Sequence, residues 1–258
     1  MWRFLQDGRV DPAANDNYLT NGTNSRVVNA IHWSSYYGHT DVVKLLLADG
    51  RADPAANDNY SIRLSSQYGH TDVVKLLLAD ARIDPTARDN HAIKWSSYHG
   101  HTDVVQLLFA DGRVDPTADN NWAIQVSSYN GHTGVVKLLL ADERVDPTAN
   151  YNAAIVRSSY HGHTGVVKLL LADERVDPTA NYNAAIARSS YHGHTGVVKL
   201  LLADGRVDPT ASCANGHTDV VKLLLADGRV DPTAKLNCGH VDVVKLLHAD
   251  RRADTTAY

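Results

Sequence analysis

The chain has 258 residues, and its 25 lysine and arginine residues face 29 aspartate and glutamate residues, for a net charge of −4. Nucleic acid is not expected as a partner, because binding to a phosphate backbone depends on an excess of basic side chains. Two cysteines are too few for a disulfide framework. No signal peptide and no stretch of about 20 apolar residues is recognised, so we expect an intracellular, cytoplasmic protein that does not bind membranes.

A Gly-His pair followed by an apolar stretch recurs along the whole chain. The first five intervals between these pairs are 31 residues each, and the last two are 23. Self-similarity at a fixed period of this size predicts a stacked array, in which each repeat buries its apolar face against its neighbours. The glycines of the pairs are Gly38, Gly69, Gly100, Gly131, Gly162, Gly193, Gly216 and Gly239.

The ends of the array depart from the regular period. Residues 1–52 are predicted to form a partial, irregular N-terminal repeat with an inserted loop at 19–30. Residues 208–258 are predicted to form two shortened repeats and a C-terminal cap. In the first shortened repeat, Asp208 is the expected N-cap and Pro209 the first residue of a shortened helix.

Residues 53–207 are predicted to be five regular repeats, each with two helices. In the repeat at 84–113, the first helix is expected over 91–99. Asn90 is its expected N-cap, because an Asn side chain can accept from the free N–H groups of the first turn. Gly100 is expected to end this helix, because glycine adopts the left-handed conformation at little cost.

The second helix of the same repeat is predicted after the Gly-His turn. Thr102 is its expected N-cap, and Asp103 follows in the first turn, where the helix dipole favours a negative charge. The Val and Leu residues within 104–110 are expected to form a core face. The serine pair of the first helix, Ser96 and Ser97, is interpreted as a site of close packing between helices.

Helix, Gly-His turn, helix and return loop together resemble the ankyrin repeat. The residues that carry the resemblance are Tyr68-Gly69-His70-Thr71-Asp72-Val73-Val74-Lys75-Leu76-Leu77-Leu78 and their copies. It implies an all-α, ankyrin-type helical repeat solenoid over residues 1–258. The period of 31 is shorter than the family's usual length of about 33. A compact turn and the family's β-hairpin finger therefore remain alternatives for the loop.

The repeats are most similar to the large ankyrin families of giant amoebal viruses. If the origin is viral, the expected location is the cytoplasm of the host cell.

Two variable residues follow each serine pair, and the resemblance implies that they face the concave groove. Tyrosine combines a rigid apolar face with a polar tip, and it is over-represented in binding surfaces. We therefore predict a protein-binding surface here, with packing of the tyrosines between repeats as the alternative. Its residues are Tyr36, Tyr37, Tyr68, Tyr98, His99, Tyr129, Asn130, Tyr160, His161, Tyr191 and His192.

The residue before each serine pair is usually buried and aliphatic in the family. Trp33 and Trp95 occupy this position and are expected in the core. Arg157 and Arg188 occupy it in later repeats, and their long side chains are expected to extend to solvent.

Catalytic and metal chemistry find little support in the sequence. The histidine of the Gly-His turn occurs in every repeat, and the resemblance implies that its side chain hydrogen-bonds to loop backbone between repeats. Pairs such as His99 and His101 could bind a metal, but zinc needs four ligands. Cys213 and Cys238 have histidines at spacings that do not match each other. We expect no enzyme activity, no cofactor, no metal and no small-molecule substrate.

The predicted function is a monomeric protein–protein interaction module, or scaffold, that binds an unidentified protein partner on its concave face. The alternative is a degenerate or purely structural array without a specific partner. That alternative is favoured by the shortened last repeats and by glycines near helix starts, at Gly134, Gly165 and Gly196.

Overall fold

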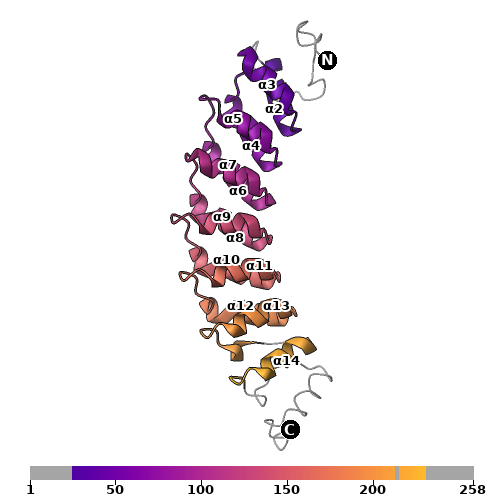
Figure 1. Ribbon diagram of the computed structural model, residues 1–258, viewed down its shortest axis with the longest axis vertical. Helices are drawn as coiled ribbons and strands as arrows, with labels where there is room; N and C mark the ends of the chain where they lie inside the picture. Colours follow the sequence, from indigo (N-terminus) through magenta and orange to yellow (C-terminus); the bar gives the residue numbers. More distant parts are fainter. Residues whose placement is uncertain (1–24, 213–214, 231–258) are drawn as a thin grey trace, which may run out of the picture. The chain divides into compact units, whose positions relative to one another are not determined.

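A computed structural model describes residues 25–212 and 215–230 of the chain (Figure 1). These residues form 13 α-helices and one short 3-10 helix, and no strand lies among them. The fold is an all-α helical repeat solenoid, as predicted. The chain divides into two compact units, unit 1 at Met1–Ala118 and unit 2 at Asp119–Tyr258.

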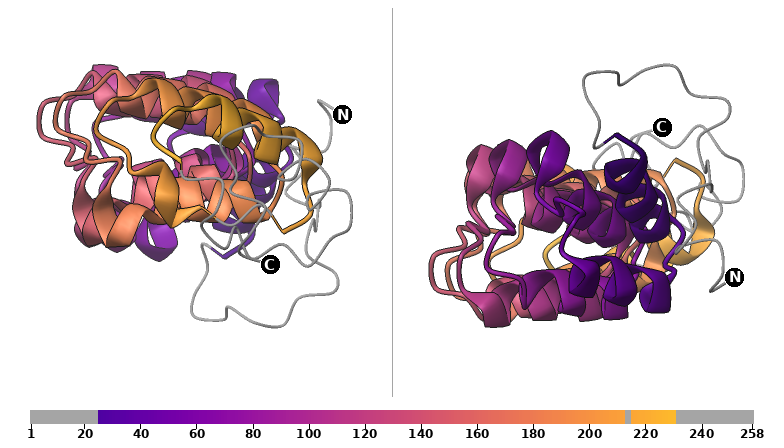
Figure 2. Two further views of the ribbon diagram at one scale, coloured as in Figure 1. Left: turned by 90° about the horizontal axis from the view of Figure 1, so that it is seen from below. Right: turned by 90° about the horizontal axis from the view of Figure 1, so that it is seen from above.

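Unit 1 contains three described helix pairs. They are α2 Ser25–Tyr36 with α3 Thr40–Asp49, α4 Ala56–Gln67 with α5 Thr71–Leu78, and α6 Ala87–His99 with α7 Thr102–Asp111. The first helices of the pairs pack side by side in one layer, and the second helices pack in the other (Figure 2). Because α2 begins at Ser25, the predicted loop at 19–30 is wrong from that residue onwards; residues 19–24 lie outside the described part.

Unit 2 repeats this arrangement. Its helices are α8 Ala118–Tyr129 with α9 Thr133–Leu140, α10 Ala149–Tyr160 with α11 Thr164–Leu171, α12 Ala180–Tyr191 with α13 Thr195–Ala203, and finally the 3-10 helix η1 Pro209–Ala211 with α14 Thr218–Ala226. The Asp208 side chain caps η1 by accepting from the Thr210 N–H at 2.9 Å, as predicted. The first helix of this shortened repeat is nevertheless only one 3-10 turn. The second shortened repeat and the predicted cap lie mostly beyond residue 230, outside the described residues.

A left-handed turn opens the first helix of each regular repeat. In α6 the φ angles of Arg88, Asp89 and Asn90 are 56°, 55° and 57°, and no β-hairpin finger forms there. Left-handed backbone costs roughly 1–2 kcal/mol per residue, and Asn and Asp tolerate it best. Asn90 is not the predicted N-cap, because its Oδ1 accepts from the backbone N–H of Asp115 in the next repeat, at 2.7 Å.

The Gly-His turn joins the two helices of each repeat. Gly100 has a φ of 78° and ends α6, as predicted. Thr102 is the first residue of α7 and donates its hydroxyl to the Gly100 carbonyl at 3.5 Å, so the prediction that it caps α7 is wrong. Asp103 lies in the first turn of α7, as predicted.

The core lies between the two helix layers. Val104, Val105 and Leu108 of α7 are fully buried, so the predicted core face is confirmed. Ser96 and Ser97 are also fully buried, as their interpretation as a close-packing site requires. The Ser96 hydroxyl donates to the Ile93 carbonyl at 3.2 Å, whereas the Ser97 hydroxyl has no hydrogen-bond partner within the described residues.

Within residues 25–212 and 215–230, no helix has the length and apolar character needed to cross a membrane.

Candidate protein-binding surface

The turn histidines fix the end of each first helix against the next repeat. In unit 2, Nε2 of His163 lies 2.8 Å from the carbonyl oxygen of Tyr129. A carbonyl can only accept, so Nε2 carries the proton and donates it. The histidines therefore have the structural role that the resemblance implied. The same bond joins His70 to Tyr36, His101 to Gln67 and His194 to Tyr160, at 2.7–3.0 Å.

The glycine of the turn is required for two reasons. Gly162 has a φ of +75°, where a side chain is strained. A Cβ atom at this position would also lie 2.5 Å from Nδ1 of His194, in the following repeat. Glycine thus lets the histidine ring of one repeat lie directly on the turn of the repeat before it, and this contact positions the variable residues just before the turn.

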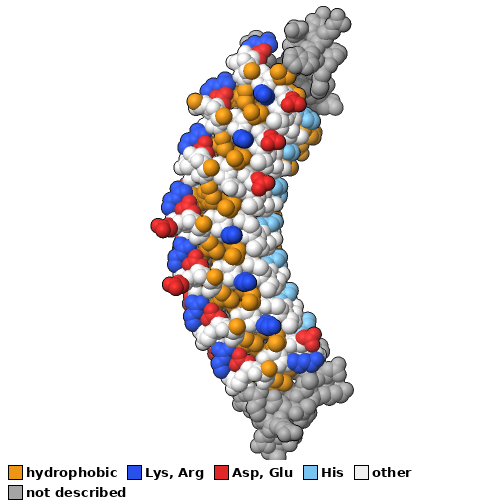
Figure 3. Space-filling view, viewed as in Figure 1, with side chains coloured by type: hydrophobic (Ala, Val, Ile, Leu, Met, Phe, Trp, Pro, Cys, Tyr) orange, Lys and Arg blue, Asp and Glu red, His pale blue; other side chains and the backbone are white. Residues whose placement is uncertain are grey.

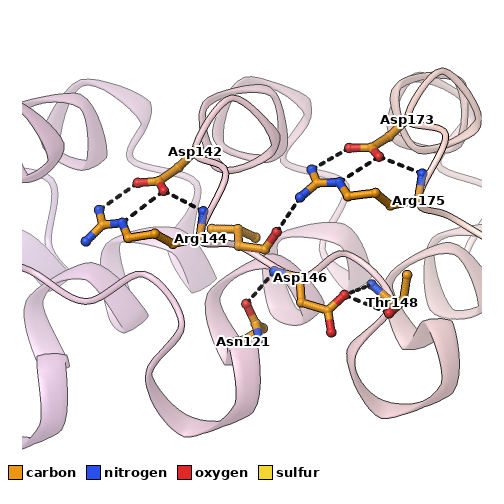
Figure 4. A network of polar contacts seen from close by, with 8 residues as sticks. Asn121, Asp142, Arg144, Asp146, Thr148, Asp173 and Arg175 are labelled. Carbon is orange, nitrogen blue, oxygen red and sulfur yellow. Dashed lines mark hydrogen bonds and ion pairs between the residues drawn. The ribbon is translucent and has the colours of Figure 1, made fainter.

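A second set of contacts holds the opposite edge of the helix pairs (Figure 4). Nη1 of Arg175 donates to the Val145 carbonyl of the preceding repeat at 2.8 Å. The same guanidinium forms a bidentate pair with Asp173, at 2.9 and 2.6 Å, and lowers the pKa of that carboxyl. Equivalent arginine bonds to the preceding repeat are made by Arg82, Arg113, Arg206 and Arg229.

The asparagine that ends each left-handed turn supplies a third contact between repeats, which the sequence reasoning missed. Oδ1 of Asn121 accepts from the backbone N–H of Asp146 at 2.8 Å (Figure 4). This asparagine recurs every 31 residues, and that recurrence could have identified its role in the sequence. The same bond is made by Asn59, Asn90, Asn152 and Asn183, at 2.7–2.9 Å.

These contacts leave two chemically different edges on the helix pairs. Figure 3 shows histidine side chains along one edge, and the arginines and acidic residues of the turns along the opposite edge. The predicted binding residues lie beside the histidines, because they immediately precede the Gly-His turns.

In unit 1 the predicted residues form an aromatic cluster. The rings of Tyr36 and Tyr68, from successive repeats, meet edge to face at 4.6 Å between centroids. Tyr37 also lies edge to face on Tyr36, at 4.7 Å, yet 58% of its surface is exposed. Tyr98 and His99 are both exposed and lie 5.0 Å apart. Tyr36, Tyr37 and Tyr68 are thus joined by ring contacts, and Tyr37, Tyr68 and Tyr98 are exposed, whereas Tyr36 is half-buried.

In unit 2 the two variable positions after each serine pair bring a tyrosine against a histidine. Tyr129 meets His161 of the next repeat at 4.4 Å, and Tyr160 meets His192 at 4.4 Å, both edge to face. Tyr191 is 48% exposed. Each tyrosine is thus oriented by a neighbouring ring without being covered by it. Asn130, the remaining predicted residue, is half-buried.

The histidines of this unit lie close enough to influence one another. His161 stacks on His163 at 6.0 Å, and His192 stacks on His194 at 6.1 Å. Partial burial lowers the pKa of His161, and repulsion from the neighbouring imidazoles of His163, His194 and His192 lowers this pKa further. His161 therefore carries less positive charge at pH 7 than a free imidazole does.

The tryptophans before the serine pairs belong to this surface and not to the core. Trp33 is half-buried and stacks on Tyr37 at 5.9 Å. Trp95 is half-buried and stacks on His99 at 6.0 Å. The prediction that both occupy the core is wrong, because each indole lies against an exposed ring of this surface, Tyr37 or His99.

Arg157 and Arg188 are exposed, as predicted. The Cζ atom of Arg188 lies 5.9 Å from the centroid of the Tyr160 ring, which is within the range of a cation–π contact.

Three further exposed tyrosines, Tyr60, Tyr151 and Tyr182, were not among the predicted residues. Tyr151 and Tyr182 lie in the left-handed turns of α10 and α12, and they are 80% and 97% exposed. The sequence feature that could have identified Tyr151 and Tyr182 is an aromatic residue at the turn position that Asp58 and Asp89 occupy in unit 1.

Within the described ranges, no three His, Cys, Asp or Glu side chains are arranged to hold a metal ion. Cys213 and Cys238 lie outside those ranges.

Sequence profiles identify the repeats. The profile described as ankyrin repeats in three copies matches residues 9–89, 62–152 and 123–212, and the single ankyrin-repeat profile matches residues 210–237. The chain therefore belongs to the ankyrin-repeat family, as the sequence pattern indicated. Ankyrin repeats are generally protein–protein interaction modules, and proteins built from them are typically not enzymes. A comparison with curated proteins finds no match.

Proposed function

We propose that this ankyrin-repeat chain is a non-enzymatic, monomeric module that holds a protein partner on its concave face, in the cytoplasm. The observation that carries the proposal is the exposure of tyrosines that neighbouring rings already orient. Tyr129, Tyr160 and Tyr191 of unit 2 are each between about a third and a half exposed. Their edge-to-face contacts restrict the rings before any partner arrives.

Such an arrangement suits recognition of a protein surface. Association costs side-chain entropy when flexible groups are immobilised, and rings that are already oriented reduce this cost. Tyrosine also presents a large apolar area and a hydroxyl that can hydrogen-bond. The same residue type recurs at the same place in successive repeats, so a partner lying along the repeats could contact several rings at once.

A purely structural array without a specific partner is the second candidate. It is favoured by the contacts between repeats, such as those from Tyr129 to His161 and from Tyr160 to His192. In that case the rings stabilise the stack and recognise nothing.

Affinity capture from a lysate of the source cells separates the two candidates. The bait is the full chain, compared with the variant Tyr129→Ala, Tyr160→Ala, Tyr191→Ala. We expect the natural chain to retain a protein that this variant loses. Binding of that protein, once purified, should weaken at least about tenfold, which corresponds to about 1.4 kcal/mol.

The matched control is the variant Tyr151→Ala, Tyr182→Ala, which removes exposed tyrosines from the left-handed turns instead. It should retain the captured protein. Circular dichroism establishes that all three chains are equally helical. If all three retain the same proteins, the tyrosines serve packing and the structural candidate is correct.

A further inference from the structure

Nearly every described arginine side chain is held by an acidic side chain or a backbone carbonyl. The turn arginine Arg206, for example, pairs with Asp204 at 2.7 Å and donates to the Val176 carbonyl at 3.0 Å. Arg63 of α4 donates to the carbonyls of Asp58 and Asn57, at 2.9 and 3.1 Å. The held arginines are Arg51, Arg63, Arg82, Arg88, Arg113, Arg144, Arg175, Arg206 and Arg229.

Arg157 and Arg188 are different. Both are exposed, and neither forms an ion pair or a hydrogen bond through its side chain with the described residues. They occupy equivalent positions in α10 and α12, which pack side by side, and each lies one helical turn before a predicted contact tyrosine, Tyr160 or Tyr191. Two uncompensated positive charges therefore flank an aromatic surface.

No acidic residue on these helices offsets the two charges. Helices α10 and α12 contain no Asp or Glu, and neither do the Gly-His turns that follow them. In unit 1 the second residue of the second helix is acidic, as at Asp72 and Asp103. The equivalent residues of unit 2 after these turns are Gly165 and Gly196. Glycines that look like degeneration in the sequence thus also remove negative charge from beside the turns.

We propose that the face of α10 and α12 binds an extended acidic segment of the protein partner. Carboxylates of the segment would meet Arg157 and Arg188, and its intervening residues would contact Tyr160 and Tyr191. Arginine suits this role because its planar group can bind a carboxylate through two hydrogen bonds. The inference rests on the proposed protein-binding function and specifies the chemistry of the partner.

The repeat spacing defines the pattern of the segment. Packed helices lie roughly 10 Å apart, and an extended chain rises about 3.3 Å per residue. Acidic residues three positions apart would therefore match arginines in successive repeats. A nucleic acid is disfavoured, because phosphate backbones need many basic contacts, and the chain as a whole has a net charge of −4.

The test uses the full chain and a fluorescein-labelled peptide of four Glu-Thr-Val triplets, with binding followed by fluorescence anisotropy. The natural chain should bind the peptide saturably, and binding should weaken as salt is added. The variant Arg157→Gln, Arg188→Gln should bind about tenfold more weakly, because two charged contacts of modest strength are lost.

The matched control is the variant Arg51→Gln, Arg88→Gln, which loses the same charge from exposed positions in unit 1. It should bind as the natural chain does. A peptide with Gln in place of Glu should bind much more weakly. The inference is wrong if the Glu peptide does not bind saturably, if the two arginine variants bind it equally, or if the Gln peptide or an oligonucleotide of similar length binds as tightly.

These failures can be told apart from failure of the proposed function. If the tyrosine variant loses a captured protein but the Arg157→Gln, Arg188→Gln variant binds that protein and the Glu peptide normally, the acidic segment is wrong and the binding module stands. If the tyrosine variant retains every captured protein, the proposed function itself is wrong, and the inference is withdrawn with it.

Discussion

In the first and third described repeats of unit 1 the residue before the serine pair is Trp33 or Trp95, whereas in the last two regular repeats of unit 2 it is Arg157 or Arg188. The tryptophans lie half-buried among tyrosine and histidine rings, and the arginines are exposed. The backbone around them is the same, with a serine pair and a left-handed glycine. In the repeats of Trp95, Arg157 and Arg188 the turn histidine also bonds to the preceding repeat. The comparison indicates that the contacts between repeats are common to both units, while the character of each face is set by a few variable positions.

The left-handed turns give a second comparison. In unit 1, Arg63 donates to the carbonyls of its own turn, and Lys94 pairs with Asp89 at 2.8 Å. In the last two regular repeats of unit 2 the positions equivalent to these basic residues hold Val156 and Ala187. There the two turns are linked to each other through the bond from Asn181 Nδ2 to the Tyr151 carbonyl at 3.0 Å. In unit 1 the successive turns are linked instead by the ion pair of Arg88 with Asp58 at 2.6 Å. The link between turns is thus ionic in unit 1 and an asparagine hydrogen bond in these last repeats of unit 2.

The largest expected effect tests the contacts that the units share. Gly69→Ala in unit 1 and Gly162→Ala in unit 2 would each place a Cβ atom 2.5 Å from a histidine nitrogen of the next repeat, at a φ of +76° or +75°. We expect either change to lower the free energy of unfolding by about 2–5 kcal/mol, from left-handed strain together with overpacking. Urea unfolding followed by circular dichroism measures the loss.

Gly112→Ala is the matched control. Gly112 has a φ of +79°, but a Cβ atom there would meet nothing within 4 Å. This variant should therefore lose only the strain term, about 1–2 kcal/mol. A loss as large as that of Gly69→Ala would mean that the histidine contact contributes little, and the idea of a common contact between the units would fail.

Much of this scaffold could be predicted from the sequence, because each of its signals recurs with the repeat. The Gly-His turn, the Val and Leu core face and the serine pair all follow from residue type and helical spacing. The left-handed turn at Arg88, Asp89 and Asn90 could not be predicted, because Arg has no preference for that conformation and the hydrogen bond that favours it comes from the next repeat.

The candidate surface could be predicted only in part. Its tyrosines were identified through the family resemblance, and all of them except the half-buried Tyr36 are exposed. The prediction that Trp95 is buried in the core was wrong, because the burial of this side chain depends on the neighbouring rings and not on its position in the helix. The lack of a partner for Arg157 is likewise a property of the surrounding residues, which the sequence pattern alone does not reveal.

A smaller effect separates the two units by their response to acid. Burial, together with the nearby positive charge of Arg63, lowers the pKa of His32 in α2 from 6.5 to about 4, against opposing contributions from a hydrogen bond with the Ala56 backbone and from Asp53. Below pH 6.5 the unfolded chain binds a proton that folded His32 does not accept until about pH 4. Stability of this part of unit 1 should therefore fall as the pH falls from 6.5 towards 4, by about 1 kcal/mol at pH 5.5.

Hydrogen exchange read by mass spectrometry at pH 7 and pH 5.5, corrected for intrinsic rates, measures this change in each unit. His32→Gln is the matched variant, because Gln125 occupies the equivalent position in unit 2. It should reduce the acid sensitivity of peptides from unit 1. Burial also lowers the pKa of His91 to about 4, so part of the sensitivity should remain. Equal acid sensitivity of both units, unchanged by His32→Gln, would contradict this difference between them.

The smallest expected effect is a gain in stability that both units should share. The second serine of each pair is fully buried, and the hydroxyls of Ser97 and Ser159 have no hydrogen-bond partner within the described residues. Ser97→Ala and Ser159→Ala should each raise the free energy of unfolding by about 0.5–1 kcal/mol, because an unpaired buried hydroxyl is removed and alanine favours a helix.

The first serine of the pair provides the control. The hydroxyl of Ser158 donates to the Ala154 carbonyl at 2.8 Å. Ser158→Ala should therefore bring little or no gain, because a hydrogen bond is lost with the hydroxyl. Urea unfolding of the four chains measures both differences. If Ser97→Ala and Ser159→Ala destabilise the protein, the second hydroxyl has a favourable contact, and the serine pair is more than a close-packing site.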